Sequence, residues 1–167
     1  MNVAVTGAPG VGKTTAVRRA AMLLSSILPV GFYTEEVRDE DGERIGFDIV
    51  TLDGKRGILA RKGPTALPRV GKYVVDVEAF EELALPVLRL KSRLYLVDEI
   101  GRMECFSPAF VERVREILFS PAHLLATVGL RGEGFLAEVR RRKDIIFLTA
   151  TAENREALPR QLAGFFA

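Results

Sequence analysis

The sequence predicts a three-layer α/β fold built on a mostly parallel sheet that an antiparallel meander extends. Short apolar runs alternate with helical segments along most of the chain, which is typical of α/β proteins. A glycine-rich loop motif follows the first apolar run and precedes a helical segment. Two Asp-Gly pairs, at 41–42 and 53–54, each separate two runs of strand type, so they predict hairpins with antiparallel pairing.

The first strand, loop and helix follow from local pattern. Residues 2–6 form a short run rich in β-branched residues and predict a buried strand. The loop Gly7–Thr14 fits the pattern G-x-x-x-x-G-K-[ST]. The segment after it carries apolar residues at helical spacing, namely Ala16, Val17, Ala20, Ala21, Leu24 and Leu28. The motif therefore stands at a strand–loop–helix junction, the context in which it binds phosphate.

Turn and cap residues predict the other elements. Strands are expected over 30–37, 45–52, 55–60, 73–75, 94–97, 123–128 and 145–149, with a surface loop over 61–71. Asp76 and Ser107 are expected to cap helices, the second with Pro108 at its first position. Pro86 is expected to kink or end the helix that follows Asp76. Further helices are predicted over 134–142 and 154–165.

Length and composition limit the class of protein. The 167 residues predict one domain over 1–167, and the 48% of apolar residues suffice for a substantial core. The net charge of +2 favours neither a nucleic acid nor a membrane as partner. The single cysteine excludes an intrachain disulfide, and no leader-like or membrane-length apolar segment is seen. We expect a monomeric, cytoplasmic protein.

The loop motif predicts a site for a nucleoside triphosphate with Mg²⁺. Glycines at 7, 10 and 12 let the backbone approach a polyphosphate closely. The inward-pointing N–H groups and the helix N-terminus then attract the anion. Lys13 can reach the β- and γ-phosphates, and the Thr14 hydroxyl can bind Mg²⁺.

A second group of acidic residues follows the apolar run that begins at Leu94. Asp98 ends that strand and is expected to hold Mg²⁺, directly or through water. Glu99 comes next and could orient and polarise an attacking water, which favours hydrolysis with Lys13 and Glu99 as the catalytic residues. Glu104 is a competing base, placed second because it lies further from the strand end.

Other polar residues follow strands at the same edge of the predicted sheet. Arg102 and Arg131 could bind phosphate, although each could instead form a surface ion pair. Asn154 could contact a nucleobase and Arg155 could stack on it, but a cap of the final helix is the preferred interpretation of Asn154. Glu35 and Glu36 could approach the metal or substrate, with a charge pair on an edge strand as the default.

With these residues in place, the chain resembles a small family of P-loop nucleoside-triphosphate phosphatases, also called cancer-related nucleoside-triphosphatases. The resemblance covers essentially the whole chain. It depends on the phosphate loop and on five further blocks: GFYTEEV at 31–37, GFDIVTLDG at 46–54, VGKYVVD at 70–76, VDEIGRME at 97–104 and the pair at 154–155.

The resemblance implies a RecA-like P-loop NTPase sheet with an added catalytic Glu. It also implies slow, Mg²⁺-dependent hydrolysis of ATP, GTP, CTP and other triphosphates to the diphosphate and phosphate. The family commonly has Lys where this chain has Arg102, so the charge is kept. By position, the implied nucleotide-binding residues are Gly7, Ala8, Pro9, Gly10, Val11, Gly12, Lys13, Thr14, Thr15, Leu96, Val97, Asp98, Glu99, Ile100, Gly101 and Arg102.

Two alternative functions stay open at this point. A nucleoside, nucleotide or polynucleotide-end kinase would need an acceptor pocket, which could lie over the meander at 30–60. It would also need an arginine-rich lid, and Arg61, Lys62 and Arg69 in the following loop could supply one. An NTP-loaded regulatory switch would instead act on a partner protein.

Overall fold

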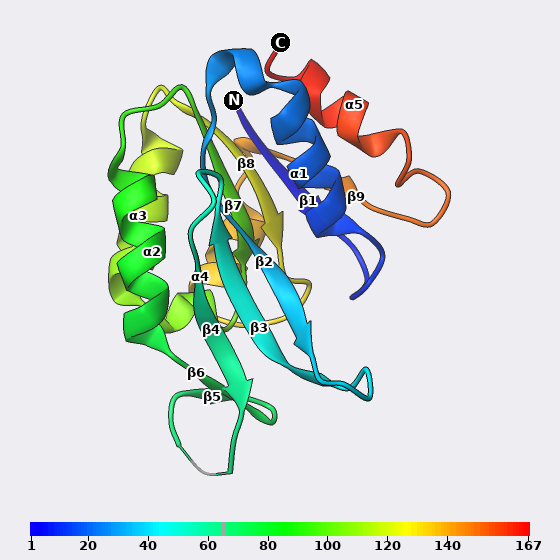
Figure 1. Cartoon of the computed structure of the whole chain (residues 1–167). Coiled ribbons are helices and arrows are strands. Elements are labelled where there is room, and N and C mark those ends of the chain that lie inside the picture. The colour runs from blue at the N-terminus through cyan, green and yellow to red at the C-terminus, as the bar shows by residue number, and fades with distance from the viewer. Residues whose placement is uncertain (65) are drawn as a thin grey trace.

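A computed structural model describes residues 1–64 and 66–167 of the chain, in which one mixed sheet carries helices on both faces (Figure 1). Along the sheet the strands follow the order β5-β6-β4-β3-β2-β7-β8-β1-β9. Their bounds are β1 Asn2–Thr6, β2 Val30–Arg38, β3 Arg44–Thr51, β4 Arg56–Lys62, β5 Arg69–Val70, β6 Tyr73–Val75, β7 Leu94–Ile100, β8 His123–Val128 and β9 Ile145–Thr149.

The sheet has a parallel part and an antiparallel part. Strands β2, β7, β8, β1 and β9 pair in parallel, with β8 between β1 and β7. From β2 the sheet continues through β3, β4, β6 and β5, and all four of these pairings are antiparallel. This arrangement confirms the predicted fold class, a largely parallel sheet with an antiparallel extension.

The antiparallel extension is longer than the sequence predicted. Strand β4 runs on to Lys62, and β5 pairs Arg69 and Val70 with β6 inside the segment expected to be a surface loop. Thr65, in the same expected loop, lies outside the described residues. Two-residue strands such as β5 are too short to show an alternating pattern, so no pattern of residues indicates this strand.

The helices form two layers, one on each face of the sheet. Helices α1 (Lys13–Leu23) and α5 (Leu158–Gly164) cover one face, and α2 (Val77–Arg89), α3 (Pro108–Phe119) and α4 (Phe135–Arg141) cover the other (Figure 1). Two single 3₁₀ turns, η1 (Ser25–Ile27) and η2 (Glu104–Phe106), lie in connections. Alternate residues of β1 serve the two layers, since Val3 and Val5 pack toward α1 while Ala4 packs toward α2 and α3.

The predicted caps of two helices are confirmed. The Asp76 carboxylate accepts a hydrogen bond from the Ala79 N–H at 2.9 Å and starts α2. The Ser107 hydroxyl accepts one from the Phe110 N–H at 3.0 Å and starts α3, whose first residue is Pro108. Each cap satisfies an N–H group that has no partner within its helix.

Three local predictions about helices are wrong. The prediction that α2 could end at Pro86 is wrong, because the helix continues to Arg89 and its fully buried side chains, such as Phe80 and Leu88, hold it against the sheet despite the lost hydrogen bond. Leu28 is 78% exposed and lies beyond the end of α1 with a φ of 51°, so it is not part of the apolar stripe. Helix α5 begins at Leu158, four residues after Asn154, so Asn154 does not cap it.

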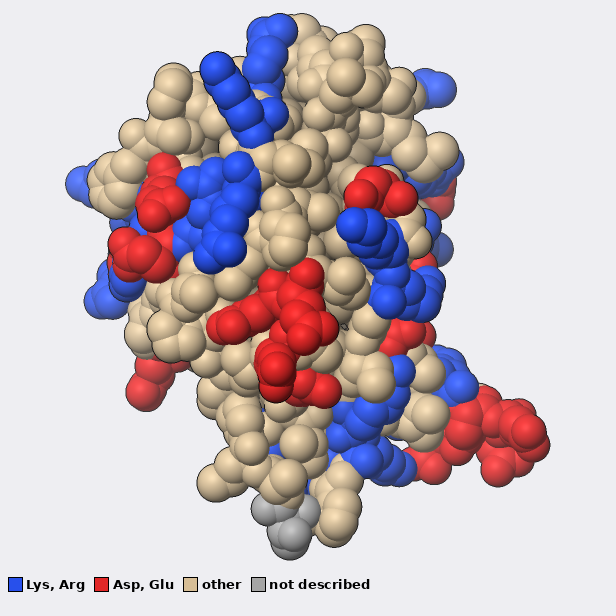
Figure 2. Space-filling model, turned by 60° about the vertical axis from the view of Figure 1, so that its left-hand side comes forward, with Lys and Arg blue, Asp and Glu red and all other residues tan. Residues whose placement is uncertain are grey.

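Charges of both signs are interspersed on the face of the molecule that Figure 2 shows. On the face in Figure 2, acidic side chains form a central patch and basic side chains lie on either side and below it. A uniformly basic surface would favour nucleic-acid binding, and no such surface is seen on this face. Among residues 1–64 and 66–167, no helix combines the length and the apolar character needed to cross a membrane.

Candidate active site

A cleft of about 1220 Å³ opens at the carboxyl ends of the parallel strands, beside the loop that joins β1 to α1. This is the edge at which open α/β sheets bind their ligands. The cleft is lined on one side by residues of the phosphate loop and on the other by Asp98, Glu99 and Glu104. The structure thus brings together the two groups of residues that the sequence singled out.

The phosphate loop has the tight backbone that the motif requires. Gly7, Gly10 and Gly12 have φ values of 146°, 77° and 107°, in the region that side chains disfavour. A Cβ at Gly7 would also lie 2.8 Å from the Ala150 carbonyl oxygen, so a larger residue would not fit there. The Lys13 ammonium donates hydrogen bonds to the Gly7 and Ala8 carbonyls at 2.9 and 3.1 Å, so its charge lies within the loop.

Asp98 is the centre of a hydrogen-bond cluster at the bottom of the cleft. The Thr14 hydroxyl and the Thr34 N–H donate to its Oδ2 at 2.8 and 3.2 Å, and the Thr127 hydroxyl donates to its Oδ1 at 2.5 Å. The side chain is almost fully buried, and burial raises the pKa of Asp98 while these hydrogen bonds and Lys13 oppose the rise. The cluster fixes both carboxylate oxygens in position.

Thr34 and Thr127 were not identified from the sequence. Thr127 lies near the carboxyl end of β8, and Thr34 lies in the middle of β2, two residues after Phe32, where the pairing of β2 with β7 ends. A hydroxyl residue within a predicted strand is a weak signal by itself. It becomes informative only when the strand order is known.

The residues around Thr14 and Asp98 fit a magnesium ion. They offer one hydroxyl and one carboxylate, the hard oxygen ligands that Mg²⁺ prefers. No group of three or more His, Cys, Asp or Glu suited to a metal occurs in the described part of the chain. Magnesium at phosphate sites requires only one or two carboxylates, because substrate oxygens and water complete its octahedron.

Glu99 and Glu104 flank one glycine. A Cβ at Gly101 would lie 2.6 Å from a Glu99 carboxylate oxygen and 2.7 Å from one of Glu104, so only glycine leaves room for both. The peptide bond between Asp98 and Glu99 is cis. Glu104 begins η2 and is 4% exposed, whereas Glu99 is half-buried. Both predicted bases therefore face the cleft from adjacent positions.

Burial raises the pKa of both carboxyl groups. It raises the pKa of Glu104 well above its usual range, and the neighbouring charge of Glu99 raises it further. Burial and the charge of Asp98 raise the pKa of Glu99, while Lys13 acts in the opposite direction. A pair of this kind can take up and release a proton inside the cleft.

The remaining candidates lie at different places. Arg102 and Arg131 are exposed and line the cleft near Glu99. The Asn154 amide is used in a turn, where Oδ1 accepts from the Thr151 N–H and Nδ2 donates to the Thr149 carbonyl, both at 2.8 Å. The Arg155 Cδ lies 4.0 Å from the position of a Cβ at Gly12, so Arg155 lies against the phosphate loop.

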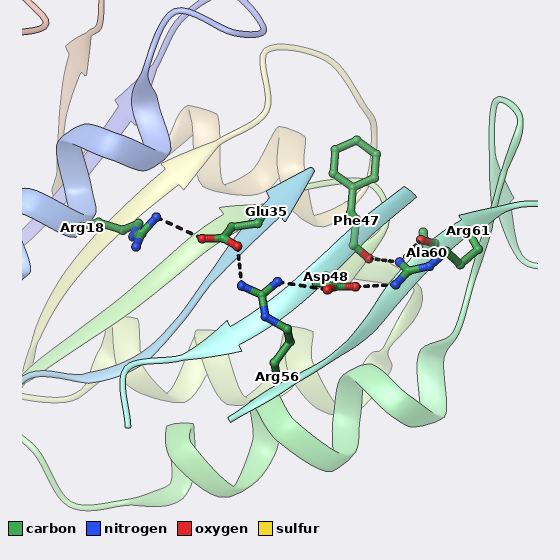
Figure 3. Close-up of polar contacts among 7 residues, drawn as sticks. All are labelled: Arg18, Glu35, Phe47, Asp48, Arg56, Ala60 and Arg61. Atoms are coloured by element: carbon green, nitrogen blue, oxygen red, sulfur yellow. Dashed lines mark hydrogen bonds and ion pairs between the residues drawn. The ribbon is translucent and has the colours of Figure 1, made fainter. Parts of the chain in front are cut away.

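Glu35 and Glu36 form ion pairs, but the expectation of an edge strand is wrong, because β2 lies between β3 and β7. Glu35 pairs with Arg18 of α1 at 3.1 Å and also with Arg56, which belongs to a chain that continues through Asp48 to Arg61 (Figure 3). Glu36 pairs with Arg38 and Arg44. The first chain connects the helix after the phosphate loop to the meander.

Comparison with known proteins identifies the group to which the chain is related. The sequence model of a family described as NTPase matches residues 2–163. The chain belongs to the NTPase family. This membership confirms the resemblance stated from the sequence, and with it the prediction of an enzyme of the nucleoside-triphosphatase class.

Individual members of the NTPase family are similar over nearly their whole length. The chain is 47% identical to the cancer-related nucleoside-triphosphatase of Homo sapiens, over 94% of this chain and 92% of that protein. It is 41% identical to the nucleoside-triphosphatase THEP1 of Thermotoga sp. (strain RQ2), over 95% and 91%. The crystal structure of THEP1 from Aquifex aeolicus superposes with a TM-score of 0.88 at 37% identity, covering 99% of this chain and 98% of that one, which confirms the fold.

Proposed function

We propose that this member of the NTPase family hydrolyses nucleoside 5′-triphosphates to the diphosphate and phosphate, that the reaction depends on Mg²⁺, and that most bases are accepted. The observation that carries the proposal is the contact between Thr14 and Asp98 at 2.8 Å, directly beside the Lys13 loop. This contact joins a polyphosphate cradle to a metal-binding carboxylate, the two parts that phosphoryl transfer requires.

Binding of the triphosphate would depend on the phosphate loop, which includes Lys13 and Thr14, and on Asp98. The backbone N–H groups of the loop would hold the phosphates, and the Lys13 ammonium would turn from the Gly7 and Ala8 carbonyls to the β- and γ-oxygens. Thr14 and Asp98 would hold Mg²⁺, which neutralises charge on those oxygens when it is bound. Arg102 and Arg131, at the rim of the cleft, are placed to stabilise further negative charge.

Hydrolysis would proceed by attack of a water on the γ-phosphorus. Glu99 follows Asp98 directly and would orient that water. The oxygen of the water bonds to phosphorus, the bridging oxygen departs with the diphosphate, and the proton from water passes to the Glu99–Glu104 carboxyl pair. Glu104, whose pKa burial raises most strongly, can keep that proton until phosphate leaves.

We expect broad base acceptance because few side chains are free to form hydrogen bonds that distinguish one nucleobase from another. The Asn154 amide is already hydrogen-bonded on both its oxygen and its nitrogen, so it has little capacity to recognise a base edge. Arg155, beside Gly12, can stack on any base through its planar guanidinium. Most of the binding energy would then come from the triphosphate, which every substrate shares. A cytoplasmic location and a monomeric state stay predictions from the sequence.

The test is phosphate release from ATP, GTP, CTP and UTP, each with and without Mg²⁺, by the wild type and by Glu99→Gln and Glu104→Gln. We expect release from all four with Mg²⁺ and none without it. Glu99→Gln should lower kcat by about 100- to 10,000-fold while nucleotide binding persists, because a general base contributes about that much. A larger loss in Glu104→Gln would transfer the role of base to Glu104, and full activity in both variants would reject this mechanism.

A further inference from the structure

The cleft continues past the catalytic carboxylates into a second half that hydrolysis does not use. We call this half the distal pocket and define it by Glu36, Arg44, Phe47, Leu59, Val70 and Tyr73, which come from β2 to β6. The whole cleft of about 1220 Å³ is larger than the roughly 300–1,000 Å³ of a typical site for one small ligand. There is space for a second molecule beside the triphosphate.

The distal pocket has a planar, aromatic wall. The Phe47 and Tyr73 rings meet edge to face, with centroids 5.3 Å apart. The Arg44 guanidinium lies 5.1 Å from the Phe47 centroid and 5.4 Å from the Tyr73 centroid. Tyr73 is only 6% exposed, so the partly exposed Phe47 ring and the Arg44 guanidinium plane are the groups on which a nucleobase can stack.

Hydrogen bonds hold this wall in place. The Arg44 Nε donates to the Tyr73 hydroxyl at 2.8 Å, and Nη1 donates to the Glu36 carboxylate at 3.0 Å. The Arg44 charge is thus paired with Glu36, which also pairs with Arg38. Lys72 lies 5.7 Å from the Tyr73 centroid as a further cation of the cleft. Glu36 can also accept a hydrogen bond from a hydroxyl or amino group of a ligand in the pocket.

The order of strands places the distal pocket at the γ-phosphate end of the site. Asp98 and Glu99 belong to β7, and β7 is the neighbour of β2, from which the meander starts. Arg155, the side chain suited to stack on the base of the triphosphate, follows β9 on the far side of β1. The ring of a molecule in the distal pocket therefore lies beyond the reacting phosphate, on the side away from the substrate base.

We propose that the distal pocket binds a nucleoside whose hydroxyl accepts the γ-phosphoryl group in competition with water. The proposal rests on the triphosphate site of the proposed function. The hydroxyl oxygen of the nucleoside bonds to the γ-phosphorus, the bridging oxygen leaves with the nucleoside diphosphate, and the hydroxyl proton passes to the Glu99–Glu104 pair. The products are a nucleoside monophosphate and a nucleoside diphosphate, and water takes the place of the hydroxyl when the pocket is empty.

The experiment follows the label of γ-labelled ATP with Mg²⁺ and millimolar adenosine, guanosine, cytidine or uridine. We expect part of the label in nucleoside monophosphate, in a proportion that rises and saturates with the concentration of at least one nucleoside. If all label appears as inorganic phosphate while ATP is consumed, the proposal is overturned. It is also overturned if a nucleoside only raises the KM for ATP, because the rings would then hold the base of the triphosphate.

Two variants of the aromatic wall, each with a matched control, test whether the transfer of label to nucleoside monophosphate depends on the distal pocket. Phe47→Leu and Arg44→Gln should each lower the ratio of nucleoside monophosphate to phosphate by about fivefold or more, since stacking on one aromatic side chain contributes at least that much. Phe119→Leu and Arg19→Gln change exposed residues outside the cleft and should leave the ratio unchanged. Equal ratios in all four variants would overturn the assignment.

Equilibrium dialysis of a labelled nucleoside without ATP separates this proposal from the proposed function. If the protein consumes no triphosphate under any condition, hydrolysis itself is refuted. Saturable nucleoside binding that is weakened in Phe47→Leu and Arg44→Gln would still support the distal pocket. Absence of saturable binding to the wild type would overturn it.

Discussion

The Thr14 hydroxyl donates a hydrogen bond of 2.8 Å to the carboxylate of Asp98, 84 positions further along the chain. The first residue belongs to the start of α1 and the second to the end of β7. Their contact brings the phosphate loop and the acidic strand end together in one cleft.

Substitution of Gly101 by alanine should disturb the two carboxyl groups at once. A Cβ there would come within 2.6 Å of Glu99 and 2.7 Å of Glu104, so at least one side chain must move. We expect kcat for triphosphate hydrolysis to fall by about 10- to 100-fold, because displacement of a catalytic group by about 1 Å has such an effect. Steady-state kinetics measures the loss.

Gly164→Ala is the matched control for Gly101→Ala. Gly164 lies in α5, and a Cβ there meets no atom within 4 Å. This variant should keep wild-type kcat. Wild-type kcat in Gly101→Ala as well would show that the arrangement of Glu99 and Glu104 around the glycine is not required.

The raised pKa of Glu104 should make the free energy of unfolding depend on pH. In the unfolded chain Glu104 ionises near the ordinary pKa of about 4.3. Between that value and its higher pKa in the folded protein, the folded state holds a proton that the unfolded state has lost. The free energy of unfolding should therefore fall as the pH rises through this window.

Urea unfolding between pH 4 and pH 8 measures this effect in the wild type and in Glu104→Gln. The variant cannot ionise at this position, so its stability should decline less with rising pH and exceed that of the wild type at neutral pH. Glu153→Gln, at an exposed position, should follow the wild-type curve. Parallel curves for Glu104→Gln and the wild type would contradict the account.

The ion-pair chain of Figure 3 should contribute to stability mainly through its buried member. Asp48 has only 12% of its side chain exposed and bonds Arg56 at 3.0 Å and Arg61 at 2.6 Å. Asp48→Asn should lower the free energy of unfolding by about 1.5–3 kcal/mol, the range for hydrogen bonds between charged groups. Chemical denaturation measures the change.

Glu43→Gln provides the contrast with Asp48→Asn. The Glu43 side chain that pairs with Lys62 is 57% exposed, so solvent screens the pair and Glu43→Gln should change the free energy of unfolding much less than Asp48→Asn. A loss in Glu43→Gln as large as that in Asp48→Asn would mean that burial does not set the contribution of these pairs.

Local pattern was enough to predict the parts of the site that lie close together in the sequence. The strand before Gly7, the loop and the helix form one continuous segment with its own signature. Asp98 and Glu99 could be identified because an acidic pair directly after an apolar strand has few other interpretations. The helix caps at Asp76 and Ser107 could also be predicted from the neighbouring sequence alone.

Features that depend on strand order or packing could not be predicted. Thr34 and Thr127 reach Asp98 only because β2 and β8 flank β7, and a single sequence does not give that order. Pro86 lies within α2 because tertiary packing outweighs its local preference. The distal pocket combines side chains from several strands of the meander, so its aromatic wall has no signature in the sequence.

The most direct test of the central claim is a Mg²⁺ titration of triphosphate hydrolysis by the wild type and by Asp98→Asn. Asparagine keeps the shape of the side chain but removes the charge that would hold the metal, and Asp144→Asn, at an exposed position, is the control. We predict that Asp98→Asn requires more Mg²⁺ and loses at least about 100-fold in kcat, as expected when a group that stabilises transition-state charge is removed. Wild-type kcat and Mg²⁺ dependence in Asp98→Asn would contradict the account.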